Sequence, residues 1–538
     1  MAQQLNRNVD LSHLRLVRTA GGLIGRPAPR TPLAAILVAT FAGTKLALHF
    51  LTTAVTPYGI HRDEFLYLAM GRHLRFWRMD FPPLIALLAD VARALLGDTL
   101  FAVRFFPALA GVALVVLAAL IARELGGGRF AQGTAMLAVL LSPLFLRASA
   151  LFQPVVLDQL WWTLGLYALV RIGKAERPGD DRGWWVLLGV ACGLGLLTKF
   201  SIAFFGIGVL AALFLSPLRP SLSTPWPYLA AVVALLVGSP AIVGQVRLGF
   251  PVFGQLHDLR SAQLQRVSAL DFLGGQLLLG PAVVLALAGL VHLLRSDRTQ
   301  PYRAVGWSCL VAFLVLLALQ GKSYYVGPIY PALFAAGATA LEGMPGMAGS
   351  LLRPLTAVLI AAFGVLVLPF GLPVVAPPQM ARYAAALGLT SAVTTNRGEV
   401  LPLPQDYADM LGWEEQVAAV ARVYHALPPE QRTRAVIIAS NYGEAGALDF
   451  YGPRHGLPPA VCPCGSYWFF GPGAKAGEVA VILGTPAEEL APLFRSVRLA
   501  TTVDPAWVVP EERRNPVVVA EGPYRTLQQV WPSLAGRN

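Results

Sequence analysis

Two adjacent acidic residues at positions 63 and 64 are the clearest chemical signal in the sequence. Asp63 and Glu64 lie in YGIHRDEFLYLAMGRHL (58–74), directly after a long apolar run. Neighbouring carboxylates at such an edge could accept a proton from a hydroxyl or hold a divalent cation. The alternative is structural, with Asp63 as the N-cap of a helix and Glu64 favouring the helix dipole.

Basic and aromatic residues near the ends of apolar runs are candidates for binding an anion. A lysine ends the run LLTKFS, and the turn QGKSYYVGPIYP holds another lysine with two tyrosines. If 64–78 is helical, Leu68, Arg72 and Arg75 share one face. The candidates for phosphate binding are Arg62, Arg72, Arg75, Lys199, Lys322, Tyr324 and Tyr325. Alternatively, the lysines extend to the membrane interface and the tyrosines belong to its aromatic belt.

Asp158 is the single acidic residue in the apolar stretch FQPVVLDQLWW. A carboxylate inside a membrane is costly and usually faces a cavity or a charged partner. We expect Asp158 either to join Asp63 and Glu64 in catalysis or to lie in a buried structural pair. The sequence does not identify a cofactor. A divalent cation is one option, with Glu64 and His257 as candidate ligands. A solvated loop at 247–270 is the simpler interpretation of His257.

The composition requires a membrane protein to position these residues. Hydrophobic residues make up 55% of the 538 residues, charged residues 13%, and the mean hydropathy is +0.58. Soluble domains carry about 25% charged residues. A soluble, disordered or collagen-like chain is therefore excluded. Residues 376–538 hold 13 Lys and Arg against 15 Asp and Glu, so the net charge of +12 arises around the membrane part. No nucleic-acid partner is predicted.

Eleven apolar runs are candidate transmembrane helices. The first, 33–55, would span about 35 Å as a helix, which is enough for a hydrocarbon core of about 30 Å. The other runs are 101–122, 130–148, 154–171, 184–199, 200–216, 226–246, 270–294, 304–320, 328–343 and 352–375.

Basic residues predict the orientation of these helices in the cell membrane. A tail over 1–32 with five arginines places the N-terminus in the cytoplasm, and basic loops at 171–182 and 295–303 fall on the same side. After eleven crossings, the C-terminal region lies on the extracytoplasmic side.

The loop 56–100 falls outside, yet it also carries five arginines. Positive charge on this side needs a reason, and an anionic ligand at the outer face is the simplest one. Arg93 is an exception, because 84–96 is typical of a helix in the membrane interface, where lipid headgroups are the expected partner.

The chain changes character after residue 375. A helix is predicted over 413–426, and the short apolar runs at 435–439, 479–483 and 516–520 predict buried strands. The sequence therefore predicts a cytoplasmic tail (1–32), a transmembrane domain (33–375) with the outer loop 56–100, and an extracytoplasmic α/β domain (376–538).

Two further motifs in the C-terminal domain carry weaker signals. The stretch NYGEAG (441–446) follows a predicted strand and is interpreted as a plain strand–helix turn, because it lacks a full glycine fingerprint. Cys462 and Cys464 are too close together to suggest a disulfide framework. With no persuasive catalytic cluster after residue 376, the domain is predicted to shape acceptor choice.

The stretch 58–74, then DFPPLIALLA, the helix of Asp158 and GKSYYVGPIYP together resemble the family 39 glycosyltransferases. These are GT-C membrane enzymes related to protein O-mannosyltransferases and the lipid A aminoarabinose transferase. The resemblance covers most of the membrane region and is strongest over 58–110. It implies a mainly α, polytopic GT-C fold with an extracytoplasmic site.

The resemblance also implies an inverting transfer of a sugar from a polyprenyl-phosphate donor to an acceptor hydroxyl. Asp63 matches the catalytic aspartate and Glu64 its acidic neighbour. The chain departs from the family at Phe81, where relatives commonly carry a basic or imidazole residue, so another cation has to contact the phosphate. The acceptor, which could be protein, lipid or glycan, is not indicated.

Two functional classes other than a transferase are possible for a membrane protein of this composition. A transporter or lipid flippase would use intramembrane Asp158 and Lys45, but no matched repeats or broken helices are visible in the sequence. A non-catalytic envelope assembly protein would leave the acidic pair and the outer arginines unexplained. A membrane glycosyltransferase therefore accounts for more of the sequence.

Overall fold

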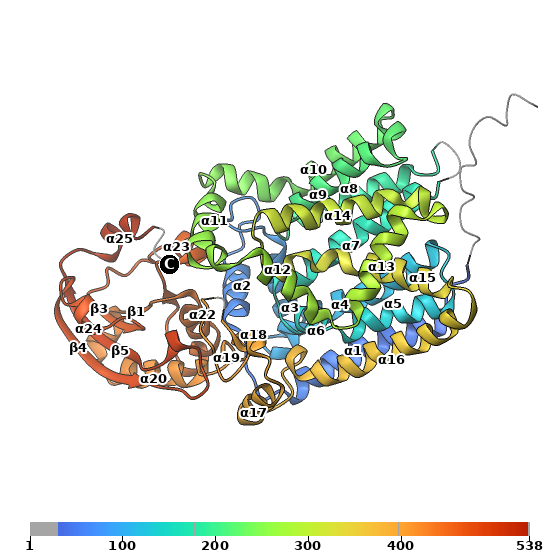
Figure 1. Cartoon of the computed structure of the whole chain (residues 1–538). Helices are drawn as coiled ribbons and strands as arrows, with labels where there is room; N and C mark the ends of the chain where they lie inside the picture. Colours follow the sequence, from blue (N-terminus) through green and yellow to red (C-terminus); the bar gives the residue numbers. More distant parts are fainter. Residues whose placement is uncertain (1–30, 176–178, 396, 536–538) are drawn as a thin grey trace, which may run out of the picture.

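The computed structural model describes residues 31–175, 179–395 and 397–535. A large bundle of helices is joined at one end to a smaller part that contains a sheet (Figure 1). The five arginines of the predicted cytoplasmic tail all precede residue 31 and lie outside the described residues.

All eleven predicted apolar runs contain helices. Within the described residues, six stretches are long and apolar enough to cross a membrane: α1 (Ala35–Val55), α4 (Leu100–Glu124), α7 (Pro154–Gly173), α10 (Trp226–Arg247), Asp297–Ala318, which contains α14 (Arg303–Ala318), and α16 (Gly346–Gly371). Two bent pairs of helices raise this number to eight. The shorter helices are α8 (Arg182–Leu196), α9 (Ile202–Leu215) and α15 (Tyr330–Glu342). A polytopic helical bundle is confirmed, whereas eleven crossings stay a prediction.

The two bent pairs break at proline and glycine residues. α5 (Arg129–Leu141) meets α6 (Pro143–Ala150) at 59°, and residues 269–279, which begin with α12 (Ala269–Gly275), meet α13 (Ala282–Arg295) at 105°. Pro143 has no N–H with which to continue the hydrogen bonds of α5. Gly280, at φ 56°, adopts a conformation that favours glycine.

The outer loop contains two helices, α2 (Arg62–Arg72) and α3 (Leu84–Leu96). The helix predicted at 84–96 is therefore confirmed. Near the end of α3, Arg93 Nε donates a hydrogen bond of 2.5 Å to Asp98 Oδ1.

The helix expected over 64–78 is too long. α2 ends at Arg72, so Arg75 does not share a helical face with Leu68 and Arg72. α3 packs directly on the last turn of α2, where a Cβ on Gly71 would lie 3.0 Å from the backbone oxygen of Ala86. This packing makes the chain turn back instead of extending the helix.

A five-stranded sheet with the strand order β2-β1-β3-β5-β4 forms the core of the C-terminal domain. β1 runs parallel to β2 and β3, and β5 runs antiparallel to β3 and β4. The strands are β1 (Ala435–Ala439), β2 (Ala460–Val461), β3 (Val479–Leu483), β4 (Phe494–Val503) and β5 (Asn515–Pro523). The three predicted strands correspond to β1, β3 and part of β5, and the predicted helix is α20 (Trp413–His425).

One cysteine expectation is wrong. Cys462 and Cys464 form a disulfide with each other, and their Cα atoms are 5.5 Å apart. This spacing lies in the range that disulfide geometry requires, so one intervening residue is enough to bring the two cysteines together.

Tight glycine packing between α13 and α15 yields the first prediction. A Cβ on Gly337 would lie 2.0 Å from the backbone oxygen of Leu285. We expect Gly337→Ala to lower the free energy of unfolding by about 1–3 kcal/mol, because the helices must separate. Thermal unfolding of the purified protein measures this loss. In the control Gly43→Ala, no atom lies within 4 Å of the new Cβ, so stability should be unchanged or slightly higher. Equal midpoints for both variants would contradict the packing argument.

Candidate active site

The first turn of α2 is fixed by a reciprocal cap at His61. The Asp63 N–H donates to His61 Nδ1 at 3.0 Å, and the His61 N–H donates to Glu64 Oε2 at 2.8 Å. Such a capping box satisfies two amide donors at the start of a helix. Asp63 is therefore not the N-cap, and its carboxylate is free to point elsewhere.

Glu64 is a buried structural centre. Arg104 on α4 contacts both of its carboxylate oxygens at 3.2 Å. The Phe152 N–H, in the segment between α6 and α7, donates to Oε1 at 2.8 Å. Glu64 is 0% exposed and Arg104 is 3% exposed. One carboxylate thereby joins α2, α4 and the segment that precedes α7.

Asp63 has different surroundings from its neighbour. It is partly exposed, and its oxygens accept hydrogen bonds from Gln153 Nε2 at 3.0 Å and from the Tyr442 hydroxyl at 2.9 Å. Gln153 precedes α7, and Tyr442 begins α22 (Tyr442–Tyr451) of the C-terminal domain. Asp63 thus lies where the helical bundle meets the C-terminal domain, called the outer domain below after its predicted side, and each oxygen keeps lone-pair capacity for another partner.

Close packing brings α22 onto α2 (Figure 1). A Cβ on Gly446 would lie 2.4 Å from the Phe65 Cβ, so only glycine permits this approach. Asn441 caps α22 by accepting the N–H groups of Gly443 and Glu444. The predicted strand–helix turn at 441–446 is confirmed, but the sequence analysis did not identify Tyr442 as a contact of Asp63.

Arg62 lies beside this contact. Its guanidinium carbon is 5.0 Å from the centre of the Tyr442 ring, a distance typical of a cation–π interaction. The side chain is enclosed between α2 and the outer domain. Burial opposes its charge, but Tyr442, Asp409, Glu512 and Asp63 outweigh this effect and raise the pKa of Arg62. Arg62 is thus a fixed positive charge beside Asp63.

Asp158 and the two candidate lysines form a second group. Asp158 is buried and accepts hydrogen bonds from Trp162 Nε1 at 3.0 Å and from the Ser201 hydroxyl at 2.9 Å. Lys199 Nζ is 4.4 Å from the centre of the Tyr325 ring and 5.7 Å from that of Tyr324. The Lys199 charge also acts on Asp158.

Lys322 extends this group toward Asp63. Its Nζ lies 6.0 Å from the centre of the Tyr324 ring. Burial and the positive charge of Lys199 lower the pKa of Lys322 to about 8, against the attraction of Asp406 and Asp63. Two lysines and two tyrosines therefore lie together, and the charge of Asp63 acts on two of them, Lys322 and Tyr324.

The outer arginines lie elsewhere. Arg72 is nine residues beyond Asp63, about 13 Å along the axis of α2. Its Nη1 donates to the backbone oxygen of Asp449 at 2.6 Å, which ties α2 to the outer domain. Arg75 is exposed in the turn after α2.

The two candidate metal ligands also differ in their surroundings. Glu64 has both oxygens engaged, as described above. His257 is exposed on α11 (Pro251–Ala262), a helix in the region that was predicted to be a solvated loop. α11 is positioned from one side by Gln255, whose amide lies 3.3 Å from Asp80 Oδ2.

An unforeseen group of titratable residues lies behind the cap of α2. His61 Nε2 is 3.8 Å from Asp406 Oδ1 and 3.9 Å from Asp409 Oδ2, and Asp406 also pairs with Arg147. Burial disfavours ionisation of Asp406, but Arg147 and His61 outweigh it and hold the pKa of that carboxyl well below its usual range. Burial raises the pKa of Asp409 to about 6.

This group has the residue types of a metal site, since its candidate ligand atoms lie within 4.8 Å of one another. The protonation of His61 argues against such a site. Because Nδ1 accepts the Asp63 N–H, the proton of a neutral ring lies on Nε2, and a charged ring carries a proton there as well. A protonated Nε2 has no lone pair for a cation. The group therefore fits a structural contact, in which Arg147 on α6 pairs with Asp406 beside the cap of α2.

The chain is similar in sequence and in fold to known membrane glycosyltransferases. Residues 80–243 match a family model described as dolichyl-phosphate-mannose-protein mannosyltransferase. A stretch of 131 residues is 34% identical to undecaprenyl phosphate-alpha-4-amino-4-deoxy-L-arabinose arabinosyl transferases of Yersinia pestis (strain Pestoides F) and Yersinia pseudotuberculosis (serotype O:1b). This similarity covers 23% of the chain and 22% of the length of those relatives.

Solved structures extend the similarity to the whole fold. ArnT from Cupriavidus metallidurans, bound to undecaprenyl phosphate, superposes with a TM-score of 0.63 over 91% of this chain and 100% of that chain, at 19% identity. Its apo form gives a TM-score of 0.62 over 94% and 100% of the two chains, also at 19% identity. The chain shares the fold of ArnT. The resemblance to GT-C glycosyltransferases found in the sequence is confirmed.

The buried pair of Glu64 and Arg104 generates the second prediction. Arg104→Met removes the partner of a buried carboxylate, so we expect a loss of about 3–5 kcal/mol in the free energy of unfolding. Adding Glu64→Gln in the same chain should restore part of this loss. The exposed pair of Arg93 and Asp98 is the matched control, and Arg93→Met should cost no more than about 1 kcal/mol. Thermal unfolding distinguishes the variants, and equal costs at Arg104 and Arg93 would contradict a central role for Glu64.

Proposed function

We propose that this protein is a membrane glycosyltransferase that moves a sugar from a polyprenyl-phosphate donor to an acceptor hydroxyl. The observation that carries the proposal is Asp63, a partly exposed carboxylate held at the junction of the bundle and the outer domain. The shared fold with ArnT and the names of the sequence relatives support the same reaction class.

Asp63 acts as the general base in this proposal. The acceptor hydroxyl attacks the anomeric carbon, a new carbon–oxygen bond forms, and the bond from that carbon to the lipid phosphate breaks with inversion. The hydroxyl proton passes to Asp63, and the bonding electrons leave with the phosphate oxygen. Gln153 and Tyr442 hold the carboxylate in a fixed orientation, which improves proton transfer because less reorganisation is needed.

Lys199 and Lys322 stabilise the departing phosphate. Charge develops on the phosphate oxygen in the transition state, and fixed cations are most effective when they already face that position. The hydroxyls of Tyr324 and Tyr325 supply further donors in the same group. A bound phosphate would favour the ammonium form of Lys322, opposing the burial that lowers its pKa.

The remaining predicted site residues have supporting roles. Asp158 orients Lys199, Glu64 fixes the helix that carries Asp63, and Arg62 places positive charge beside the base. Arg72 joins α2 to the C-terminal domain, and Arg75 is exposed in the turn after α2. In this assignment, protein side chains supply the positive charge for the phosphate, and no metal ion is required.

The orientation in the membrane follows from the same proposal. The N-terminus is cytoplasmic, and the outer domain and Asp63 face the extracytoplasmic side. The lipid tail of the donor stays in the bilayer while its head group reaches Asp63 at the membrane edge. Membrane lipids, the lipid-linked donor and a hydroxyl-bearing acceptor are therefore the partners of the protein.

The role of Asp63 gives the third prediction. Asp63→Asn keeps one oxygen that can accept from Gln153 and gains an NH2 group that can donate to the Tyr442 hydroxyl. It removes the proton acceptor, so turnover should fall at least a hundredfold. Donor consumption by purified protein, measured with a panel of polyprenyl-phosphate sugars, provides the readout. Thermal stability should stay near that of the wild type. Tyr442→Phe, which only loosens the carboxylate, should reduce turnover more modestly. Undiminished turnover in Asp63→Asn would refute the assignment.

The phosphate contacts give the fourth prediction. Charge-assisted hydrogen bonds contribute about 1.5–3 kcal/mol, so Lys199→Met and Lys322→Met should each weaken donor binding or slow turnover roughly ten- to a hundredfold. Arg72→Gln and Arg75→Gln should have smaller effects, and Arg93→Gln is the exposed control. The experiment uses neutral detergent so that lipid headgroups do not contribute. Larger losses at the arginines than at the lysines would move the phosphate site to the outer loop.

A further inference from the structure

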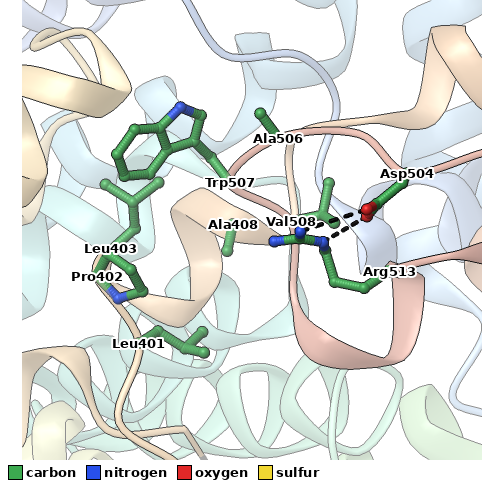
Figure 2. Close-up of a pocket in the computed structure, with 9 residues that line it drawn as sticks. All are labelled: Leu401, Pro402, Leu403, Ala408, Asp504, Ala506, Trp507, Val508 and Arg513. Carbon is green, nitrogen blue, oxygen red and sulfur yellow. Dashed lines mark hydrogen bonds and ion pairs between the residues drawn. The ribbon is translucent and has the colours of Figure 1, made fainter.

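A cavity of about 410 Å³ lies in the outer domain, away from the contacts of Asp63 described above. Two segments of the chain line it, 401–408 and 504–513 (Figure 2). Its volume falls within the range of small-molecule sites, about 300–1,000 Å³.

Trp507 forms one wall of this cavity, beside Leu403 and Pro402 (Figure 2). Its backbone has φ 67°, in the left-handed region that non-glycine residues seldom adopt and that costs roughly 1–2 kcal/mol. Such a conformation persists only where the surrounding structure holds it, and it often marks a binding site. The loop is held against α20, since a Cβ on Gly412 would lie 2.6 Å from Val508 Cγ1.

An ion pair lies on the other side of the cavity, across from the Trp507 ring (Figure 2). Arg513 Nε donates to Asp504 Oδ1 at 2.6 Å. The side chains of Arg513 and Asp504 are 51% and 40% exposed, so their remaining donors and lone pairs are accessible. An aromatic face opposite a planar, paired acid and base suits a sugar ring, whose C–H face stacks and whose neighbouring hydroxyls both donate and accept.

Other ligand chemistries fit this cavity less well. A phosphate or carboxylate would meet the negative charge of Asp504, and an acyl chain would leave the polar atoms of the ion pair without new partners. A neutral polyhydroxylated ligand can stack on the Trp507 ring and form hydrogen bonds with Asp504 and Arg513 at the same time.

The cavity is linked to the proposed active site through α19 (Gln405–Ala408). Ala408 lines the cavity, while Asp406 on the same short helix faces His61 and Arg147. The next residue, Asp409, accepts the Arg62 N–H at 3.1 Å through its backbone oxygen. One helical turn therefore separates the cavity from the cap of the helix that carries Asp63.

We propose that this cavity binds a carbohydrate portion of the acceptor, at a distance from the hydroxyl that reacts. The proposal rests on the proposed glycosyltransferase function and narrows its acceptor to a glycan or a glycan-bearing molecule. Trp507 stacks on a sugar ring, and Asp504 and Arg513 determine which hydroxyl pattern is accepted.

The test is direct binding of free trisaccharides of glucose, mannose, galactose and N-acetylglucosamine to the purified full-length protein. A detergent without a sugar head group is required, because a maltoside would compete for the cavity. Saturation-transfer NMR and calorimetry should detect binding of at least one trisaccharide. Trp507→Ala should weaken that binding at least tenfold, whereas Trp507→Phe, which keeps an aromatic face, should weaken it less. Tyr524→Ala, at an exposed aromatic residue of the same domain, should leave it unchanged.

A second variant keeps the test informative where Trp507→Ala disturbs folding. Asp504→Asn removes the charge of the acid and should change the order of preference among the trisaccharides. Absence of trisaccharide binding to the wild type, or equal binding by Trp507→Ala, would overturn the proposal. Displacement of a bound trisaccharide by decanoate, with equal loss of decanoate binding in Trp507→Ala, would assign the cavity to a lipid chain instead. Hydrolysis of the donor by the wild type, with water as the acceptor and no trisaccharide added, tests the transferase function separately.

Discussion

The structure around the proposed site depends on one buried ion pair, between Glu64 and Arg104. Removing two charges from water costs several kcal/mol per ion, and this cost is offset only where geometry and additional hydrogen bonds are favourable. Here Glu64 receives two contacts from Arg104 and one amide hydrogen bond each from His61 and Phe152. The pair thus fixes the start of α2 relative to α4 and to the segment before α7. The positions of Asp63, on α2, and of Gln153, next to Phe152, therefore depend on this ion pair.

Two adjacent carboxylates acquire different roles because successive residues of a helix point about 100° apart. Glu64 turns inward and is fully buried, while Asp63 turns toward the outer domain and stays partly exposed. The two roles considered for this pair in the sequence, chemistry and helix capping, therefore do not compete. Glu64 supplies the capping box, and Asp63 is left available for a reacting hydroxyl.

Local patterns in the sequence predicted much of the fold but only part of the site. Apolar runs predicted the helices, and short β-branched runs predicted β1, β3 and β5, because both signals come from neighbouring residues. The contact between Asp63 and Tyr442 joins residues 379 positions apart, and no local pattern encodes it. The same holds for Asp406 and Asp409 behind His61. The helix expected over 64–78 was too long because its end is set by packing of α3 on Gly71, a tertiary effect.

The contact at Tyr442 also changes the roles of the two domains in the proposed glycosyl transfer. The sequence indicated a C-terminal domain that shapes acceptor choice without performing the chemistry. In the structure, α22 of the outer domain supplies a hydrogen bond to Asp63, and Gly446 is required for that helix to approach Phe65. The lysines and tyrosines of the proposed phosphate site belong to the bundle. A donor held by its lipid tail would therefore approach the base from the membrane side, and an acceptor held by the outer domain would approach from the opposite side. Because both domains contact the same carboxylate, separation of the domains would disorient the base, which couples proton transfer to correct docking of the outer domain.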